Sequence, residues 1–406
     1  MYSDSVGIGV RKKPRLHFQK EMNANDKKIA IVHDFLLAFG GAERVLQSLV
    51  EMYPDAPIYT LLSDRKVVAR HFPKSEIRES FLAKCPGFLK RRYRWLLPFY
   101  PVAVEAFDLR DFDLVISSSG AWSKGIVTRL HTKHIAYIHS PMRSVWDENE
   151  SYLRSLGFFA PFRFLGRIML SYLRIWDKQA AQRPDVLIAN SEYTKERIAK
   201  YYRLPSEVVY PPVLLKKGAE WDERGVKGEM GTGKKGQNAP FLMVSRLTEA
   251  KKIAVAIDAF NKLELPLVIV GSGPLRQSLE KRAGKHIHFK GLQTDEQIAK
   301  WYCGARALVH VAEEDFGLAI AESLAFGTPV IAFDHGGARE LVHSGVNGEL
   351  FFAQTPEILS DGVRRFIENE GKYDQEKMRR DMLRFSKEVF QEEMKGVIEK
   401  ILFKNT

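Results

Sequence analysis

The sequence predicts an α/β protein made of two doubly wound, Rossmann-like domains that face each other across a cleft. Short apolar runs bounded by polar or small residues alternate with helical segments, a pattern that favours parallel sheets covered by helices. The 406 residues are many for one domain and enough for two with separate cores. Residues 216–240 are rich in glycine and lysine, as in a linker. We therefore predict domains at 28–212 and 241–385, joined by a connecting segment at 213–240.

Composition limits the classes of function. An apolar content of 45% with 28% charged residues is typical of a globular protein. The only two cysteines, Cys85 and Cys303, favour a reducing compartment and argue against disulfides or a cysteine-ligated metal. The net charge of +12 predicts an anionic partner: membrane lipid, nucleic acid or a phosphorylated ligand. No apolar run approaches the roughly 18 residues that a membrane-spanning helix needs.

The first 27 residues are predicted to form a disordered tail. They contain the basic run Arg11–Arg15 but no apolar core of a signal peptide. Met22 is a candidate start of the natural chain, which mass spectrometry of the native protein would decide.

The N-terminal domain is predicted to begin with a strand at Ile29–Val32, followed by a glycine turn. Gly40 and Gly41 open a helix that runs through Leu49. Glycine lets the backbone approach a ligand closely, and the free N–H groups at a helix start attract phosphate. The turn therefore suits phosphate, although it lacks the full Gly-x-Gly-x-x-Gly pattern of dinucleotide sites, and a plain tight turn remains the alternative.

Further strands of this domain are predicted at residues 113–117, 134–138 and 185–189. Parallel sheets bind ligands at the carboxyl ends of their strands. His139–Arg143 and Asn190-Ser191 directly follow the last two strands, so they are candidate site segments.

Two stretches mix cations with aromatic and aliphatic residues, Lys90–Tyr100 and Phe158–Trp176. Basic amphipathic helices of this kind lie in lipid headgroups, which predicts an anionic membrane surface as a partner. The alternative is that the apolar faces belong to the core and the cations to a solvated face.

The C-terminal domain repeats the strand and helix alternation. Arg246 ends its first strand, and Lys251 lies at the mouth of the next helix, with Lys252 as an alternative to Lys251. A guanidinium and an ammonium at one strand end can hold a diphosphate. Strands are predicted at 241–244, 267–270, 288–292, 308–311 and 330–333, and the first helix at 253–263.

The most informative stretch of this domain runs from Glu313 to Glu340. An apolar helix is predicted at Leu318–Phe326, stopped by the proline of Gly327-Thr328-Pro329. Glu314 precedes the helix and Glu322 lies about two turns further on, so both can face one side. The helix start suits phosphate, whereas carboxylates suit hydroxyl groups, and a sugar nucleotide carries both. The spacing of two glutamates alone is common by chance.

The complete string is more specific. Glu314-x7-Glu322, with Phe316-Gly317 between and Gly327-Thr328-Pro329-Val330 after, resembles the donor-site signature of retaining GT-B glycosyltransferases of family 4. The wider sequence is similar to bacterial O-antigen mannosyltransferases. The connecting segment is longer than is usual in that family. The resemblance also implies that the final helix, within residues 386–406, crosses back to the first domain.

The resemblance assigns roles to the site residues. Glu322 is expected to bind ribose hydroxyls and Glu314 hydroxyls of the transferred sugar, with help from the backbone at Phe316-Gly317-Leu318. Arg246 and Lys251 are expected to hold the diphosphate. The segment around His139 resembles the acceptor-domain motif, where the histidine orients the transferred sugar. The remaining expected donor-site residues are Gly40, Gly41, Gly271, Gly273, Gly336, Gly337 and Glu340, and those on the acceptor side are Glu43 and Arg143.

The implied reaction is hexose transfer with retention, by a front-face mechanism in which the leaving phosphate assists the incoming hydroxyl. No protein nucleophile and no cofactor are then expected, and no metal, since no Asp-x-Asp occurs in the donor site. Glu314, His139, Arg246 and Lys251 are the expected catalytic set. GDP-mannose is the favoured donor, a UDP-sugar remains open, and the acceptor is expected to be a saccharide or polyprenyl-linked saccharide. The protein is expected in the cytoplasm, peripheral at the inner face of the plasma membrane.

Other classes of function are less well supported. A GT-B phosphorylase or a sugar-nucleotide hydrolase would share the fold. An oxidoreductase would need the missing dinucleotide fingerprint. A nucleic-acid-binding module would explain the charge, but its cations should interleave with exposed aromatics on one domain, so we expect no nucleic-acid partner. The sequence does not decide the linkage formed or the oligomeric state.

Overall fold

The computed structural model describes residues 27–87, 93–155, 163–215 and 239–403. The predicted tail, the possible start at Met22 and most of the connecting segment lie outside these residues. The same holds for the first part of each of the two basic stretches and for residues 404–406.

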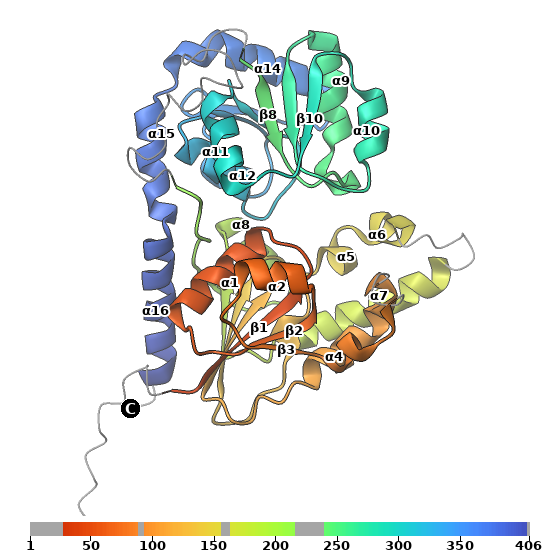
Figure 1. Cartoon of the computed structure of the whole chain (residues 1–406), viewed down its shortest axis with the longest axis vertical. Coiled ribbons are helices and arrows are strands. Elements are labelled where there is room, and N and C mark those ends of the chain that lie inside the picture. Colours follow the sequence, from red (N-terminus) through yellow and green to blue (C-terminus); the bar gives the residue numbers. More distant parts are fainter. Residues whose placement is uncertain (1–26, 88–92, 156–162, 216–238, 404–406) are drawn as a thin grey trace, which may run out of the picture.

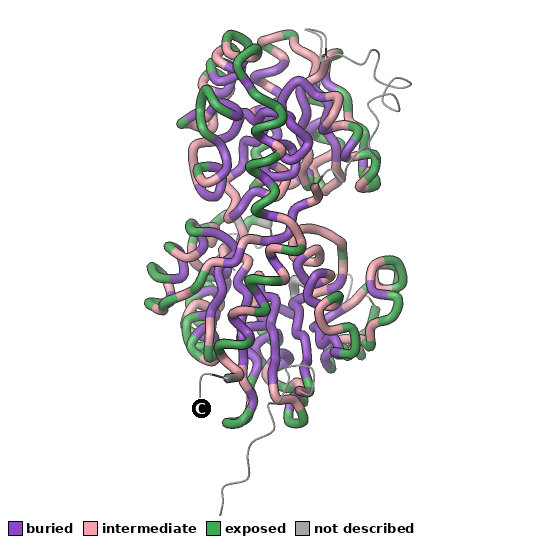
Figure 2. The backbone as a smooth tube through the Cα atoms, turned by 90° about the vertical axis from the view of Figure 1, so that its left-hand side faces the viewer, coloured by how far each residue is buried: buried purple, intermediate pink, exposed green. Residues whose placement is uncertain are grey.

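Two domains lie one above the other, each built around a parallel sheet with helices on both faces (Figure 1). The predicted fold class is therefore confirmed. The first sheet has the order β3-β2-β1-β4-β5-β6-β7 and the second β10-β9-β8-β11-β12-β13, and neighbouring strands in the described residues run parallel. Figure 2 shows the buried residues concentrated in the interior of each domain, with a narrower region between the domains.

The first domain contains the strands and helices between residues 29 and 208. Its strands are β1 (Ile29–Leu36), β2 (Ile58–Ser63), β3 (Ile77–Glu79), β4 (Leu114–Ser119), β5 (Lys133–Ile138), β6 (Val186–Ala189) and β7 (Glu207–Val208). Its helices are α1 (Gly41–Met52), α2 (Arg65–His71), α4 (Tyr100–Glu105), α5 (Arg143–Trp146), α6 (Asn149–Ser155), α7 (Arg163–Ala180) and α8 (Glu192–Tyr201). Short 3-10 turns occur at η2 (Phe81–Lys84), η3 (Tyr93–Phe99) and η4 (Ser123–Gly125).

The second domain follows the same plan. Its strands are β8 (Phe241–Val244), β9 (Leu267–Val270), β10 (Ile287–Gly291), β11 (Leu308–His310), β12 (Val330–Phe333) and β13 (Gly348–Phe351). Its helices are α9 (Ile253–Leu263), α10 (Arg276–Arg282), α11 (Asp295–Gly304), α12 (Leu318–Ala325), α13 (Ala338–Leu341), α14 (Pro356–Asn369) and α15 (Gln375–Met382). The 3-10 turns are η8 (Glu249–Lys251), η9 (Glu370–Lys372) and η10 (Leu383–Phe385), and α16 (Lys387–Phe403) ends the described chain.

The central strands are apolar because both of their faces are buried. In β1, Ala30 and Val32 pack into the core on one side of the sheet, while Ile29 and Ile31 pack into the core on the other. Successive residues of a strand point to opposite faces, so a strand between two helical layers needs an unbroken apolar run. The core of the second domain is continuous and begins at Val213, a residue that the sequence placed in the connecting segment.

The last helix returns to the first domain, as predicted. α15 lies beside the second domain and α16 beside the first (Figure 1), and the buried side chains of α16 belong to the same core as those of β1 and β5. These side chains are Phe390, Met394, Val397 and Ile398. α16 starts as a helix separate from α15, because Ser386 is extended and its hydroxyl accepts a hydrogen bond from the Val389 amide (3.2 Å).

Among the described residues, no helix has the length and apolarity to span a bilayer. Those residues also contain no group of three or more histidine, cysteine or carboxylate side chains placed to hold a metal ion.

Candidate active site

The candidate site lies between the domains, where segments after the strands of both sheets meet. Gly41, at the start of α1, lies directly against Leu318, the first residue of α12. A Cβ atom added at Gly41 would be 2.3 Å from Leu318 Cδ1, so any larger residue would force the Leu318 side chain to move. The structure thus joins the two helix starts that the sequence predicted separately as phosphate sites.

The start of α12 is flanked by both predicted carboxylates. Gly317 precedes the helix with φ of +92°, and no side chain caps the first N–H groups. Glu314 lies in the loop before it and pairs with Lys251 Nζ. Glu322 lies within the helix, only 7% exposed, and accepts a hydrogen bond from Tyr302 Oη (3.0 Å). Helix N–H groups, two carboxylates and one lysine are thus gathered at one place.

The two carboxylates differ in their protonation behaviour. Burial alone would raise the pKa of Glu314, but Lys251 and His310 outweigh it and lower the pKa to about 2. Burial raises the pKa of Glu322, although Arg44 and the Tyr302 hydroxyl oppose this. Glu314 is therefore a firmly ionised hydrogen-bond acceptor, whereas Glu322 keeps its charge at a cost.

Arg246 follows β8 and its side chain is exposed. Within the described part of the chain this side chain has no hydrogen bond or ion pair, so its guanidinium is available to a ligand. Its loop is held by close packing: a Cβ at Gly271 would be 1.9 Å from the Ser245 carbonyl oxygen, and one at Gly273 2.4 Å from that of Leu247. These two predicted site glycines therefore also position the loop that carries Arg246. Lys252 has φ of 52° and forms the corner between η8 and α9.

The second glycine pair supports the loop that contains Glu314. Gly337 donates its N–H to the Glu314 carbonyl oxygen (2.9 Å), and a Cβ at Gly336 would be 2.3 Å from that same oxygen. Glu340, predicted in the donor pocket, instead accepts hydrogen bonds from the amides of Glu192 (3.1 Å) and Tyr193 (2.8 Å) at the start of α8. A carboxylate at a helix start is electrostatically favourable, so Glu340 joins the two domains.

Arg44 connects the glycine turn to the opposite domain. Its guanidinium makes two hydrogen bonds to Asp295 at the start of α11 (2.6 and 3.1 Å), and its Nε lies 3.9 Å from Glu322 Oε1. Burial disfavours the charge on Arg44, but Glu322 and Asp295 raise its pKa. The sequence offered no signal for this contact, because the partners lie far apart in the chain.

Two further predicted residues, His139 and Glu43, belong to one chain of side chains in the first domain. His139 Nε2 lies 2.8 Å from Ser118 Oγ, and the same oxygen lies 3.1 Å from His33 Nδ1. His33 Nε2 is 3.5 Å from Glu43 Oε1, while Glu43 Oε2 accepts the Gly40 N–H (2.8 Å). Burial, together with His33, lowers the pKa of His139 to about 3. His33 and Ser118 were not predicted.

Arg143 crosses to the second domain. Its Nε donates to Asp315 Oδ2 (3.0 Å), and its guanidinium lies 3.8 Å from Glu313. Arg197, 5% exposed, pairs with the other oxygen of Asp315 and with Asp147. Ser191, named from the sequence, donates to the Asp315 backbone oxygen (2.7 Å). Asp315, next to Glu314 in the chain, is therefore the centre of an interdomain contact that the sequence analysis missed.

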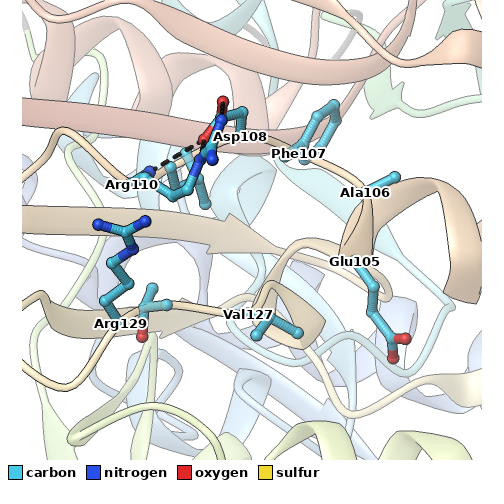
Figure 3. A pocket seen from close by; sticks show the side chains of 9 residues that line it. Glu105, Ala106, Phe107, Asp108, Arg110, Val127 and Arg129 are labelled. Atoms are coloured by element: carbon cyan, nitrogen blue, oxygen red, sulfur yellow. Dashed lines mark hydrogen bonds and ion pairs between the residues drawn. The ribbon is translucent and has the colours of Figure 1, made fainter.

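A separate surface hollow lies away from this site (Figure 3). It is lined by residues 105–110 and 127–129, which precede β4 and β5 and so lie at the opposite edge of the sheet from His139. Arg110 pairs there with its neighbour Asp108 (2.6 and 2.7 Å). None of the predicted site residues lines this hollow.

Similar proteins agree with the fold. Residues 39–217 match the family model Glycosyltransferase Family 4, and residues 230–388 match Glycosyl transferases group 1. A D-inositol 3-phosphate glycosyltransferase of Nocardioides sp. is 29% identical over 227 residues, which are 48% of this chain and 49% of the relative. The chain thus spans about half the length of this curated relative.

Two more similarities are informative. O-antigen chain mannosyltransferase C of Escherichia coli is 27% identical over 138 residues, 32% of this chain and 37% of the relative. The crystal structure of Anabaena HepE in complex with UDP and glucose superposes with a TM-score of 0.67 at 18% identity, covering 92% of this chain and 99% of that one. By its two family matches, which together cover both domains, and by its fold, the chain belongs to the GT-B glycosyltransferases of family 4.

Proposed function

We propose that this protein transfers a hexose, with retention, from a nucleotide sugar to a saccharide hydroxyl. The observation that carries the proposal is the arrangement at α12. An uncapped helix start is flanked by Glu314, Lys251 and Glu322, and the glycine turn of the other domain lies against it. Such a site offers N–H groups and cations to phosphate and carboxylates to hydroxyls.

In this proposal the donor lies between the domains. Glu322 accepts hydrogen bonds from the ribose hydroxyls, and Glu314 from hydroxyls of the transferred sugar. Arg246, exposed in the described structure, and Lys251 neutralise the diphosphate. Lys251 is held by Glu314, so its ammonium group is positioned before the ligand arrives.

The proposed transfer needs no group from the protein as a nucleophile. The bond from the sugar C1 to the diphosphate oxygen breaks, and the acceptor oxygen forms its bond to C1 on the same face. The proton of the acceptor hydroxyl passes to the leaving phosphate oxygen. The cations at the diphosphate stabilise the charge that develops on it, and the closed interdomain contact excludes water, which limits hydrolysis. A phosphorylase or a hydrolase on this fold would use the same donor groups with another acceptor.

We propose GDP-mannose as the donor, because the mannosyltransferase of E. coli is among the relatives. A UDP-sugar is the second candidate, since the HepE structure contains UDP and glucose. Isothermal calorimetry with GDP-mannose, UDP-glucose, GDP and UDP separates the two.

We expect one nucleotide series to bind wild type, and Glu322→Ala to weaken it about ten- to a hundredfold, through the loss of hydrogen bonds to a charged group. Glu280→Ala, a change on the exposed helix α10, is the matched control and should bind like wild type. Binding of neither series to wild type would contradict the proposal.

The acceptor is proposed to be a polyprenyl-linked saccharide at the inner face of the plasma membrane, because α7 has two apolar faces. Leu170, Leu173 and Trp176 are buried in the core. Another row of large apolar side chains on the same helix is exposed, and cations such as Arg167 lie among them. This row consists of Phe164, Leu165, Ile168, Tyr172 and Ile175, which are between 52% and 66% exposed. An exposed apolar row with cations fits an anionic bilayer.

Co-sedimentation with lipid vesicles tests this part of the proposal. Wild type should bind vesicles that contain phosphatidylglycerol, bind pure phosphatidylcholine less, and detach as salt rises, because salt screens the cations. Ile168→Ser with Ile175→Ser should abolish the binding, whereas Leu292→Ser, 78% exposed in the other domain, should not. Equal binding by all three proteins would rule out α7 as the contact.

A further inference from the structure

A chain of four side chains leads from the glycine turn of the first domain to His139. It passes from Glu43 to His33, then to Ser118, and from Ser118 to His139, with successive contacts of 3.5, 3.1 and 2.8 Å. Ser118 is fully buried and His33 is 2% exposed, so water does not compete for these inner contacts.

The direction of the hydrogen bonds follows from the chemistry of the ends. The Glu43 carboxylate can only accept, so the proton of a neutral His33 lies on Nε2. His33 Nδ1 then carries a lone pair and must accept from the Ser118 hydroxyl, which has one proton to give. Ser118 Oγ is left to accept, and His139 Nε2 must donate to it. The proton of His139 is thus on Nε2.

The other nitrogen of His139 is open. Nδ1 has no hydrogen-bond partner among the described residues, and it is not one of the buried unpaired atoms. Asn190 Nδ2 donates to the His139 backbone oxygen (3.0 Å), and the next residue, Ser191, donates to Asp315. His139 is therefore tied to the loop that carries Glu314, at the edge of the first sheet that faces the second domain.

We propose that Glu43, through His33 and Ser118, holds His139 in the tautomer that leaves Nδ1 as a hydrogen-bond acceptor for a hydroxyl of the transferred sugar. Glu43, His33 and Ser118 are positioning residues, since they touch no substrate themselves. The contact with a sugar rests on the proposed function, whereas the tautomer does not.

Glu43→Gln gives the proposal a sharp test. The glutamine oxygen can keep the Gly40 N–H, so its NH2 group turns to His33 Nε2 and donates. Every bond in the chain then reverses: His33 Nδ1 donates to Ser118, Ser118 donates to His139 Nε2, and the proton of His139 moves to Nδ1. Ser118→Ala removes the link, so both tautomers of His139 should appear.

The measurement is ¹⁵N NMR of protein labelled at histidine, at about pH 8, where an ordinary imidazole is neutral. Protonated and bare ring nitrogens have well-separated ¹⁵N shifts. We expect His139 protonated on Nε2 in wild type and on Nδ1 in Glu43→Gln. Glu51→Gln, the same change at an exposed position of α1, should leave His139 unchanged. His134 is the internal reference, because its Nε2 contacts Ser117 and not the hydrogen-bonded side chains between Glu43 and His139. An unchanged His139 tautomer in Glu43→Gln would overturn the proposal.

Ligand titration then tests the sugar contact. Adding GDP-mannose or UDP-glucose, whichever binds, should shift His139 Nδ1 toward the value of a hydrogen-bonded nitrogen, while the matching nucleoside diphosphate should not. Binding of the nucleotide sugar without this shift would overturn the sugar contact. If no nucleotide sugar binds, the proposed function and the sugar contact fail together, while the tautomer result stands by itself.

Discussion

Glu322 sits in surroundings that oppose its charge. It is 7% exposed and lies 3.9 Å from Arg44, and among the described residues its carboxylate accepts one side-chain hydrogen bond, from Tyr302 (3.0 Å). A buried carboxylate normally has several partners, because its oxygens offer about four acceptor positions. The unused positions of Glu322 are those that we assign to ribose hydroxyls, so the empty protein carries a cost that the ligand offsets.

Glu322→Gln should therefore raise Tm near neutral pH while weakening nucleotide binding. The pKa of Glu322 is raised in the folded state, so its contribution to stability is most favourable below the unfolded pKa of about 4.3 and is lost as pH rises through the raised value. The difference in Tm between Glu322→Gln and wild type should thus disappear at about pH 4. Differential scanning calorimetry at both pH values measures it. A lower Tm for the variant at neutral pH would show that the carboxylate is stabilising.

At the residue scale, the sequence was informative where one stretch of chain holds several site residues. In the structure Glu314 precedes α12 and Glu322 lies within it, as predicted, and Lys251 forms an ion pair with Glu314. Residues whose partners are distant in sequence escaped prediction. Asp295 shows no pattern of its own, and its contact with Arg44 exists only after both domains fold.

At the element scale, the predicted strands were those with continuous apolar runs. Three of the four missed strands have an identifiable reason. β3 and β7 are edge strands of three and two residues, too short for a periodic signal. β13 begins with Gly348, which lies so close to the Val330 carbonyl oxygen that a Cβ would be 1.9 Å from it. In the sequence this glycine favours a turn, whereas in the structure it allows β13 to approach β12 closely. β2 has an apolar run but was not assigned.

The helix α16, at the end of the described chain, contributes side chains to the core of the first domain. Phe390 is 1% exposed and its ring lies 5.8 Å from that of Tyr137, centroid to centroid. Phe390→Ala should destabilise the first domain by about 3–5 kcal/mol, through lost burial and the cavity left behind. Urea unfolding followed by circular dichroism measures the change. Glu392→Ala, at an exposed position of the same helix, should have little effect, and similar losses for both variants would mean that α16 is not packed as described.

At the scale of the whole molecule, direct contacts hold the two domains together without a ligand. They come from several elements of each domain, and most involve charged side chains. These contacts are Arg44 with Asp295, Arg143 and Arg197 with Asp315, Tyr193 with Glu313, and Glu340 with the start of α8. A donor bound between the domains, as we propose, would compete with some of them, above all with the Arg44 contact beside Glu322. Affinity for the donor therefore depends on how readily the domains separate.

Asp315→Ala tests this dependence, because one carboxylate neutralises two arginines from the other domain. Its loss leaves Arg143 and the buried Arg197 close together without that partner. Removing one member of a buried ionic group costs about 3–5 kcal/mol when the other charge stays buried. The domains can avoid that cost by separating, which lets both guanidinium groups reach water.

We therefore expect a larger radius of gyration for Asp315→Ala than for wild type in small-angle X-ray scattering of the empty protein. Asp361→Ala is the matched control, since Asp361 pairs with Arg365 within α14 (3.2 Å), inside the second domain. Nucleotide that binds both domains should reduce the difference, because it restores a bridge between them. Identical scattering of Asp315→Ala and wild type, with equal thermal stability, would mean that the other contacts alone determine the domain arrangement. In that case Asp315 would act only locally, by orienting Arg143 and Arg197.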